Sequence, residues 1–115
     1  MDNDKIDEAF RALHDALKCA QLLYMDLRDS GDATGAANAK LRADRIQNEI
    51  DNLVSKELTE WQKGAEDLIP QLTQAAANAQ KAVEEVENDV RNVQSVVSAM
   101  QTLDDAIGVA MKFVG

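Results

Sequence analysis

Residues that interrupt or cross-link a chain are scarce in this sequence of 115 residues, which has one Cys, one Pro and five Gly. The lone Cys19 has no partner for an internal disulfide, so the fold must hold together without one. So few Pro and Gly residues argue against a chain of many short turns. Aromatic residues are rare as well (two Phe, one Tyr and one Trp), so the core must be aliphatic. These shortages indicate a helical protein.

Positive charge is also in short supply, with 12 Lys and Arg against 21 Asp and Glu and a net charge of -9. An acidic surface repels a phosphate backbone, so we expect no nucleic-acid partner. No apolar run approaches the roughly 20 residues of a membrane span. The start, from Met1 to Asp4, is too polar for a secretory signal. We expect one cytoplasmic domain, residues 1–115, without a membrane partner, while export without a leader stays open.

The residue sets that support catalysis or metal binding are missing. The only His, His14, flanks the apolar stripe of the first helix, and Cys19 lies on the opposite face, where we expect a surface thiol. There is no Gly-Lys-Ser or Gly-Lys-Thr phosphate loop. Four nearby carboxylates splay around a helix and indicate a solvated face: Glu84, Glu85, Glu87 and Asp89. The sequence predicts no enzyme, no catalytic or metal-binding residue and no cofactor.

What the sequence does contain is a long heptad pattern of the coiled-coil kind. From Leu72 to Val114 an apolar residue recurs in alternating steps of four and three, and only Asp104 interrupts the series. Such a stripe obliges a long helix to pack along another helix. We expect Val90 and Val93 in the closely packed centre. The stripe consists of Leu72, Ala76, Ala79, Val83, Val86, Val90, Val93, Val97, Met100, Ile107, Met111 and Val114.

Two further apolar stripes predict two more helices. The first helix is expected at about residues 4–28, and its stripe is broad enough to pack against two neighbours. Gly31 supplies its stop, because glycine readily adopts the left-handed conformation found at helix ends. The second helix is expected at about 34–63 and the third at about 68–114.

The boundary between the second and third helices depends on a glycine and a proline. We expect Gly64 to end the second helix and Asp67 to cap the third. Pro70 then falls in the first turn, where its missing N–H is not needed. The alternative is one kinked helix from residue 35 to the end of the sequence.

The second and third helices also resemble each other at an offset of 40 residues. Asn48 matches Asn88 and Asn52 matches Asn92, at positions away from the apolar stripe. A duplicated helix, a surface displayed twice and chance all account for this resemblance.

Helix lengths predict the architecture. At 1.5 Å per residue the three helices span about 37, 45 and 70 Å, so the third overshoots the other two. We therefore expect an antiparallel up-down-up three-helix bundle whose C-terminal helix overhangs at about residues 97–114. A short fourth helix from about residue 102 is the alternative, since Thr102 and Asp105 have the spacing of a capping box.

Asp104 stands at a position of the heptad stripe. It either pairs there with a cation such as Lys112 or Arg28, or is turned to solvent while Leu103 takes its place in the core. The broad stripe favours the second arrangement.

The apolar overhang carries the functional expectation. An exposed stripe needs a partner, and we expect a homo-oligomer, with a dimer favoured, or binding to a helix of another protein. The function would then be a non-enzymatic interaction or assembly module, adaptor-like or chaperone-like. The alternative is a membrane-active bundle whose C-terminal amphipathic segment inserts into lipid. The expected interface residues are Val96, Val97, Met100, Leu103, Ile107, Met111 and Val114.

Overall fold

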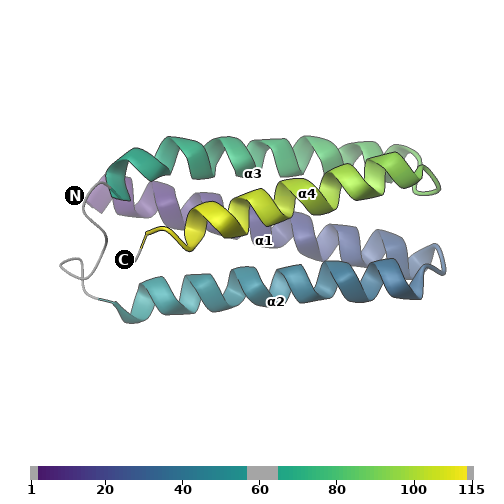
Figure 1. The fold of residues 1–115 in the computed structure, drawn as a ribbon, viewed down its shortest axis with the longest axis horizontal. Helices are drawn as coiled ribbons and strands as arrows, with labels where there is room; N and C mark the ends of the chain where they lie inside the picture. Colours follow the sequence, from purple (N-terminus) through teal and green to yellow (C-terminus); the bar gives the residue numbers. More distant parts are fainter. Residues whose placement is uncertain (1–2, 57–64, 114–115) are drawn as a thin grey trace.

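Four helices make up the part of the chain that the computed structural model describes, residues 3–56 and 65–113. They are α1 (Asn3–Asp29), α2 (Ala33–Ser55), α3 (Ala65–Asn88) and α4 (Val93–Ala110). α1 and α2 form one antiparallel hairpin and α3 and α4 a second, with both turns at the same end (Figure 1). The all-α prediction is confirmed, and the first helix was placed to within one residue at each end.

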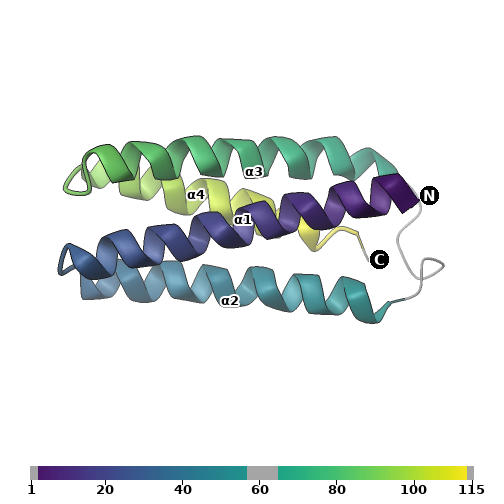
Figure 2. The same cartoon turned by 180° about the vertical axis from the view of Figure 1, so that it is seen from behind.

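The helices form an elongated bundle of 45 × 21 × 18 Å. α3 and α2 lie at opposite edges, and α1 and α4 lie between them on opposite faces (Figures 1 and 2). α1 packs closely along both α2 and α3, as its broad stripe predicts, whereas α4 packs mainly on α3. Contacts between α2 and α4 are few, as are those between α1 and α4 across the bundle, so the side between α2 and α4 is less closely packed than the other three sides.

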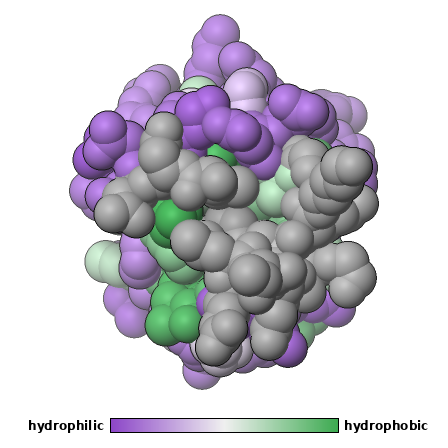
Figure 3. All heavy atoms as spheres, turned by 90° about the vertical axis from the view of Figure 1, so that its left-hand side faces the viewer, coloured by the Kyte–Doolittle hydropathy of each residue, from purple (hydrophilic) through white to green (hydrophobic). Residues whose placement is uncertain are grey.

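The core between the helices is aliphatic apart from the buried Phe113, close to what the composition predicts. No charged or polar residue is buried among those described. Seen from the end where α1 begins, the described surface is mostly hydrophilic, and apolar atoms reach it only in places (Figure 3). The largest fully buried side chains are Phe113, Leu13, Leu23, Leu27, Ile46, Leu53, Leu72, Leu103, Val83 and Val86.

The first turn, between α1 and α2, contains the left-handed glycine predicted from the sequence. Gly31 adopts a φ of +86°, in the left-handed region where a Cβ would be strained. The Asp32 side chain caps α2 by accepting the backbone N–H of Gly35 at 2.8 Å. The Ser30 hydroxyl donates to the carbonyl of Leu27, which satisfies one group at the end of α1.

The second turn overturns the predicted architecture, because the chain reverses at residues 89–92. The backbone N–H of Arg91 donates to the Asp89 carboxylate, and the Asn92 side chain accepts the N–H of Ser95 to cap α4. The three-helix bundle with an over-long helix at 68–114 is therefore wrong. Two short polar side chains make this turn without Gly or Pro, so the sequence carries no conspicuous break.

The alternative of a short fourth helix from about residue 102 is also wrong in its boundary. A fourth helix exists, but it begins at Val93. The Thr102 hydroxyl donates to the carbonyl of Ala99 inside the helix, so Thr102 does not start one.

The end of α2 and the start of α3 differ in detail from the boundaries predicted from the sequence. α2 ends at Ser55, where Lys56 is extended and donates its backbone N–H to Leu53, so the described chain does not continue as one kinked helix. Residues 57–63 of the predicted second helix, and Gly64, lie outside the described residues. α3 is already helical at Ala65, which leaves Asp67 in its first turn and Pro70 inside it. Asp67 is therefore not a cap, although its charge near the helix start is favourable.

The two hairpins repeat each other at an offset of 60 residues. Asp29 and Asp89 open the two turns, and Asp32 and Asn92 cap the helices that follow. α2 and α4 are therefore equivalent, since each is the second helix of its hairpin. The resemblance at an offset of 40 residues instead relates α2 to α3, which have different positions in their hairpins. Buried positions in α2 recur in the second hairpin as the pairs Ala39 and Ala99, Ile46 and Ala106, Ile50 and Ala110, and Leu53 and Phe113.

Candidate interaction surface

Relative to the heptad stripe predicted from the sequence, the buried positions shift by one residue after the second turn. In α3 they include the predicted stripe members, from Leu72 to Val86. In α4 four of the five buried residues come one residue before a position of the predicted stripe, as Leu103 does before Asp104, and the fifth, Ile107, is itself a predicted member. We call these positions the core stripe: Val96, Ala99, Leu103, Ala106, Ala110 and Phe113. The expectation for Val90 and Val93 is wrong, since Val90 is half-buried in the turn and Val93 is 72% exposed.

The stripe predicted from the sequence persists on α4 as a second line, which we call the outer stripe. Its two ends are open to solvent, with Val93 72% and Val97 44% exposed at the start and Met111 61% exposed at the other end. Its middle borders the core, since Met100 is half-buried and Ile107 is only 8% exposed. α4 therefore carries more apolar surface than its own bundle covers. The outer stripe consists of Val93, Val97, Met100, Asp104, Ile107 and Met111.

The seven expected interface residues divide between these two stripes. Leu103 is fully buried within its own chain, and the half-buried Val96 packs against the same core. The structure does not describe Val114. The four that remain lie on the outer stripe: Val97, Met100, Ile107 and Met111.

Asp104, the one charged member of the outer stripe, is paired across the bundle. Its two carboxylate oxygens accept hydrogen bonds from Arg42 of α2, at 2.9 Å from Nε and 3.0 Å from Nη2. The expectation of an exposed Asp104 with Leu103 in the core is confirmed, but the cation is neither Lys112 nor Arg28. The pair fixes the outer stripe on the flank of α4 that faces α2.

A groove of about 680 Å³ continues the outer stripe at the end of the bundle that carries both turns. Val93, Val96 and Val97 form its apolar wall together with Val90. The first turn, residues 29–32, and Arg91 form its polar border. The exposed start of α4 thus faces an open space instead of covering another helix.

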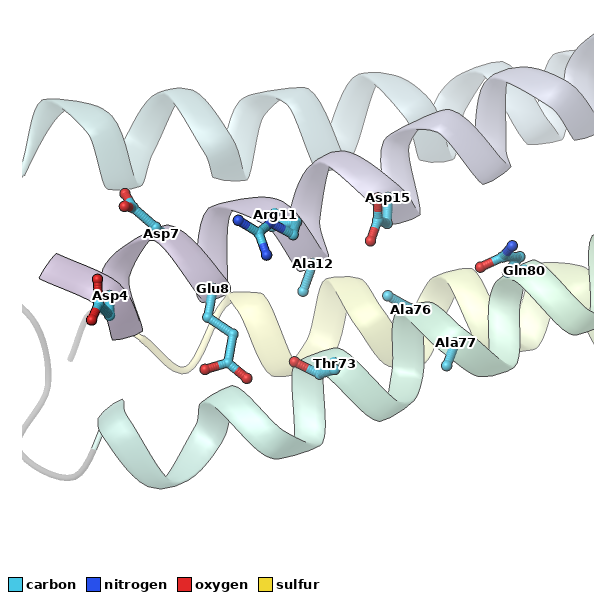
Figure 4. A pocket seen from close by; sticks show the side chains of 10 residues that line it. All are labelled: Asp4, Asp7, Glu8, Arg11, Ala12, Asp15, Thr73, Ala76, Ala77 and Gln80. Atoms are coloured by element: carbon cyan, nitrogen blue, oxygen red, sulfur yellow. The ribbon is translucent and has the colours of Figure 1, made fainter.

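A second hollow, of about 560 Å³, lies between α1 and α3. Its carboxylates come from α1 and project in different directions, while small side chains of α3 face them (Figure 4). No group of three or more His, Cys, Asp or Glu in residues 3–56 and 65–113 is arranged to hold a metal ion. The hollow is lined by Asp4, Asp7, Glu8, Arg11, Ala12, Asp15, Thr73, Ala76, Ala77 and Gln80.

The prediction of a surface thiol at Cys19 is wrong, because α3 packs on that face of α1. Cys19 is only 5% exposed. Burial, followed by the charge of Asp15, raises the pKa of its thiol from 9.0 to about 11, so the nucleophilic thiolate is scarce. His14 is exposed, and so are the four carboxylates expected on a solvated face, Glu84 to Asp89.

The sequence reading missed Asp26, near the end of α1. Its Oδ2 atom is buried and has no hydrogen-bond partner among the described residues. Burial raises the pKa of this carboxyl, and the charges of Glu87 and Asp29 raise it further. The signal was its spacing, because Asp26 follows Cys19 and Leu22 along the flank of α1 that faces α3.

Compared with models of protein families, with curated proteins and with solved structures, the chain matches none. Among the helices described above, none is both long and apolar enough to cross a membrane.

Proposed function

We propose that this chain is a non-enzymatic interaction module that binds a helix of another protein chain along the outer stripe of α4. The supporting observation is the one-residue shift between the core stripe and the outer stripe. A bundle that used α4 only for its own core would need no apolar residue at Val93, Val97 or Met111. An apolar line with heptad spacing suits a partner that is itself helical.

Two properties of this surface favour protein binding. Residues 92–103 contain no charge, so a partner can cover the first half of α4 without burying an unpaired ion. Methionine adapts its shape to different neighbours, and Met100 and Met111 lie toward the middle and at the end of the stripe. An adaptor, assembly factor or chaperone-like subunit works through a surface of this kind.

A matched pair of variants tests this proposal. The tagged chain, Val97→Glu and Met25→Glu are purified in parallel from the cells in which the protein occurs. Val97 and Met25 are equally exposed, at 44% and 45%, but Met25 lies on α1. We expect proteins bound by the parent and by Met25→Glu to be lost from Val97→Glu, and to rebind the parent after each is purified. Retention of every bound protein by Val97→Glu would contradict the proposal.

The same variants separate protein binding from the membrane-active alternative. Residues 92–113 carry Asp104 and Asp105 but only one basic residue, Lys112, so they form a poor surface for anionic lipid. We expect no flotation of the parent with vesicles of phosphatidylcholine and phosphatidylglycerol. Flotation that Val97→Glu abolishes would assign the outer stripe to lipid and overturn the proposal.

A further inference from the structure

We infer that the helix bound by the outer stripe is α4 of a second copy of this chain, packed antiparallel about a two-fold axis at the level of Thr102. The inference rests on the proposed function and names the partner. A two-fold axis requires one surface to be complementary to itself, because each copy presents the same residues. The outer stripe meets this requirement in its spacing, charge and size.

The outer stripe advances in steps of four, three, four, three and four residues, and this series is the same in both directions. In an antiparallel pair Val93 of one copy therefore faces Met111 of the second copy, and Val97 lies at the level of Ile107 of the second copy, which is only 8% exposed. Each exposed end of one stripe therefore packs against an exposed end of the other. The side chains would form successive layers like those of a coiled coil.

Charge decides the orientation. A parallel pair would set the two Asp104 carboxylates against each other at one level, and adjacent like charges are costly in an interface. An antiparallel pair sets Asp104 against Met100 of the second copy. Arg42 already neutralises Asp104 through two hydrogen bonds within the same chain, so covering the pair leaves no lone charge.

Size allows a stable dimer. The bundle is 45 Å long and 18 to 21 Å wide, so one long side has a projected area on the order of 800 Å². This is the most that one copy could bury on that side, and it matches the area that each partner buries in a typical stable complex. The side between α2 and α4 is also the least closely packed within the chain. The groove beside Val93 and Val97 leaves space for the end of a second α4.

Sedimentation of the whole chain tests the dimer. We expect the parent to dimerise in the micromolar range and Val97→Glu to weaken dimerisation at least 30-fold, while Met25→Glu leaves it unchanged. Each copy carries a net charge of -9, so salt that screens the repulsion should tighten the dimer. Circular dichroism should show equal helicity in all three proteins, because Val97 and Met25 lie outside the core.

Distances between spin labels test the orientation. Gln94→Cys and Gln101→Cys, each in a Cys19→Ala background, place one label at heptad-equivalent exposed positions of α4. At 1.5 Å per residue, the two Gln94 labels of an antiparallel dimer are displaced by about 24 Å along the helix and the two Gln101 labels by about 3 Å. The distance between Gln94 labels should therefore be clearly longer. Equal distances would overturn the antiparallel arrangement.

Other outcomes separate this inference from the proposed function. A parent that stays monomeric at 500 µM in 0.5 M NaCl overturns the dimer, and so does a Val97→Glu variant that dimerises as the parent does. Equal weakening by Met25→Glu also overturns it. If Val97→Glu nevertheless loses another bound protein in the purification described above, the binding function survives and its partner is a different chain.

Discussion

Arg42 and Asp104 lie 62 residues apart and are joined by two parallel hydrogen bonds between α2 and α4. Arg42 also donates from Nη1 to the carbonyl of Asn38, which holds its guanidinium in place on α2. The Arg42 side chain is 19% exposed and that of Asp104 is 47% exposed. The pair thus bridges α2 and α4, whose side of the bundle is less closely packed than the other three sides.

A double-mutant cycle with Arg42→Gln and Asp104→Asn should measure this bridge. We expect a coupling free energy of about 0.5–1 kcal/mol, because the pair is bidentate but half of it is open to water. Urea unfolding of the parent, both single variants and the double variant gives the value, at concentrations where the chain is monomeric. The coupling should fall in 1 M NaCl. A coupling near zero in low salt would contradict the paired geometry.

Replacing two glycines by alanine should change the stability of the fold in opposite directions. Gly31 has a φ of +86°, so Gly31→Ala should destabilise the fold by about 1–2 kcal/mol. Gly108 lies inside α4 and a Cβ there would meet nothing within 4 Å, so Gly108→Ala should stabilise it by up to about 1 kcal/mol. Thermal melts should move down and up respectively, by about 4–8 °C per kcal/mol. A common direction would contradict the assignment of Gly31 to the turn and Gly108 to the helix.

Replacing Leu103 or Leu41 by alanine compares the same substitution at a core position and at a surface position. Leu103 is fully buried and Leu41 is 47% exposed. Leu103→Ala should lower the free energy of unfolding by about 2–5 kcal/mol. Leu41→Ala should change it by less than about 0.5 kcal/mol. Similar losses in urea unfolding would contradict the burial of Leu103 in the core.

The first turn was predictable from the sequence and the second was not, for a physical reason. Gly31 interrupts the apolar pattern, whereas Asp89 and Asn92 make their turn with side-chain hydrogen bonds inside an unbroken heptad phase. α4 also carries adjacent apolar residues, so the pattern fits both the core stripe and the outer stripe. Val96 with Val97 and Ala106 with Ile107 are such neighbours. Periodicity alone could not decide which member of each pair faces the core.

The polar contacts of the candidate surface were also predictable from the sequence only in part. The exposure of Asp104 followed from the width of the stripe, since Leu103 was available to replace it. Its partner Arg42 could not be found, because only the reversal of the chain at residues 89–92 brings α4 beside α2. The burial of Cys19 could not be found either, because it depends on which face of α1 packs against α3.

The Cys19 thiol should be nearly inert in the folded protein. With a pKa of about 11, on the order of one thiol in a thousand is ionised at pH 8, and burial hinders access further. Labelling by a thiol-exchange reagent at pH 8 should be at least 100-fold slower in the folded chain than in 8 M urea. The folded protein should also form no disulfide-linked dimers in air. A folded rate within a few-fold of the unfolded rate would contradict the buried position.

Asp26 should weaken the fold at neutral pH. Burial raises its pKa, and the neighbouring charges of Glu87 and Asp29 act in the same direction. Its carboxylate also lies near the negative end of the α1 dipole. A raised folded-state pKa means that ionised Asp26 opposes folding above that pKa, and that the penalty disappears as the pH falls to the unfolded value near 3.8.

Asp26→Asn should therefore raise the free energy of unfolding at pH 7 by a few tenths to about 1 kcal/mol, and should leave it close to that of the parent at pH 3.5. Urea unfolding at the two pH values measures the difference. Asp105→Asn is the matched control, since it removes the same charge from an exposed position on α4 and should change little at either pH. A less stable Asp26→Asn at pH 7 would mean that the buried oxygen has a favourable partner in the folded chain, because an amide would then lose an interaction that the carboxylate makes.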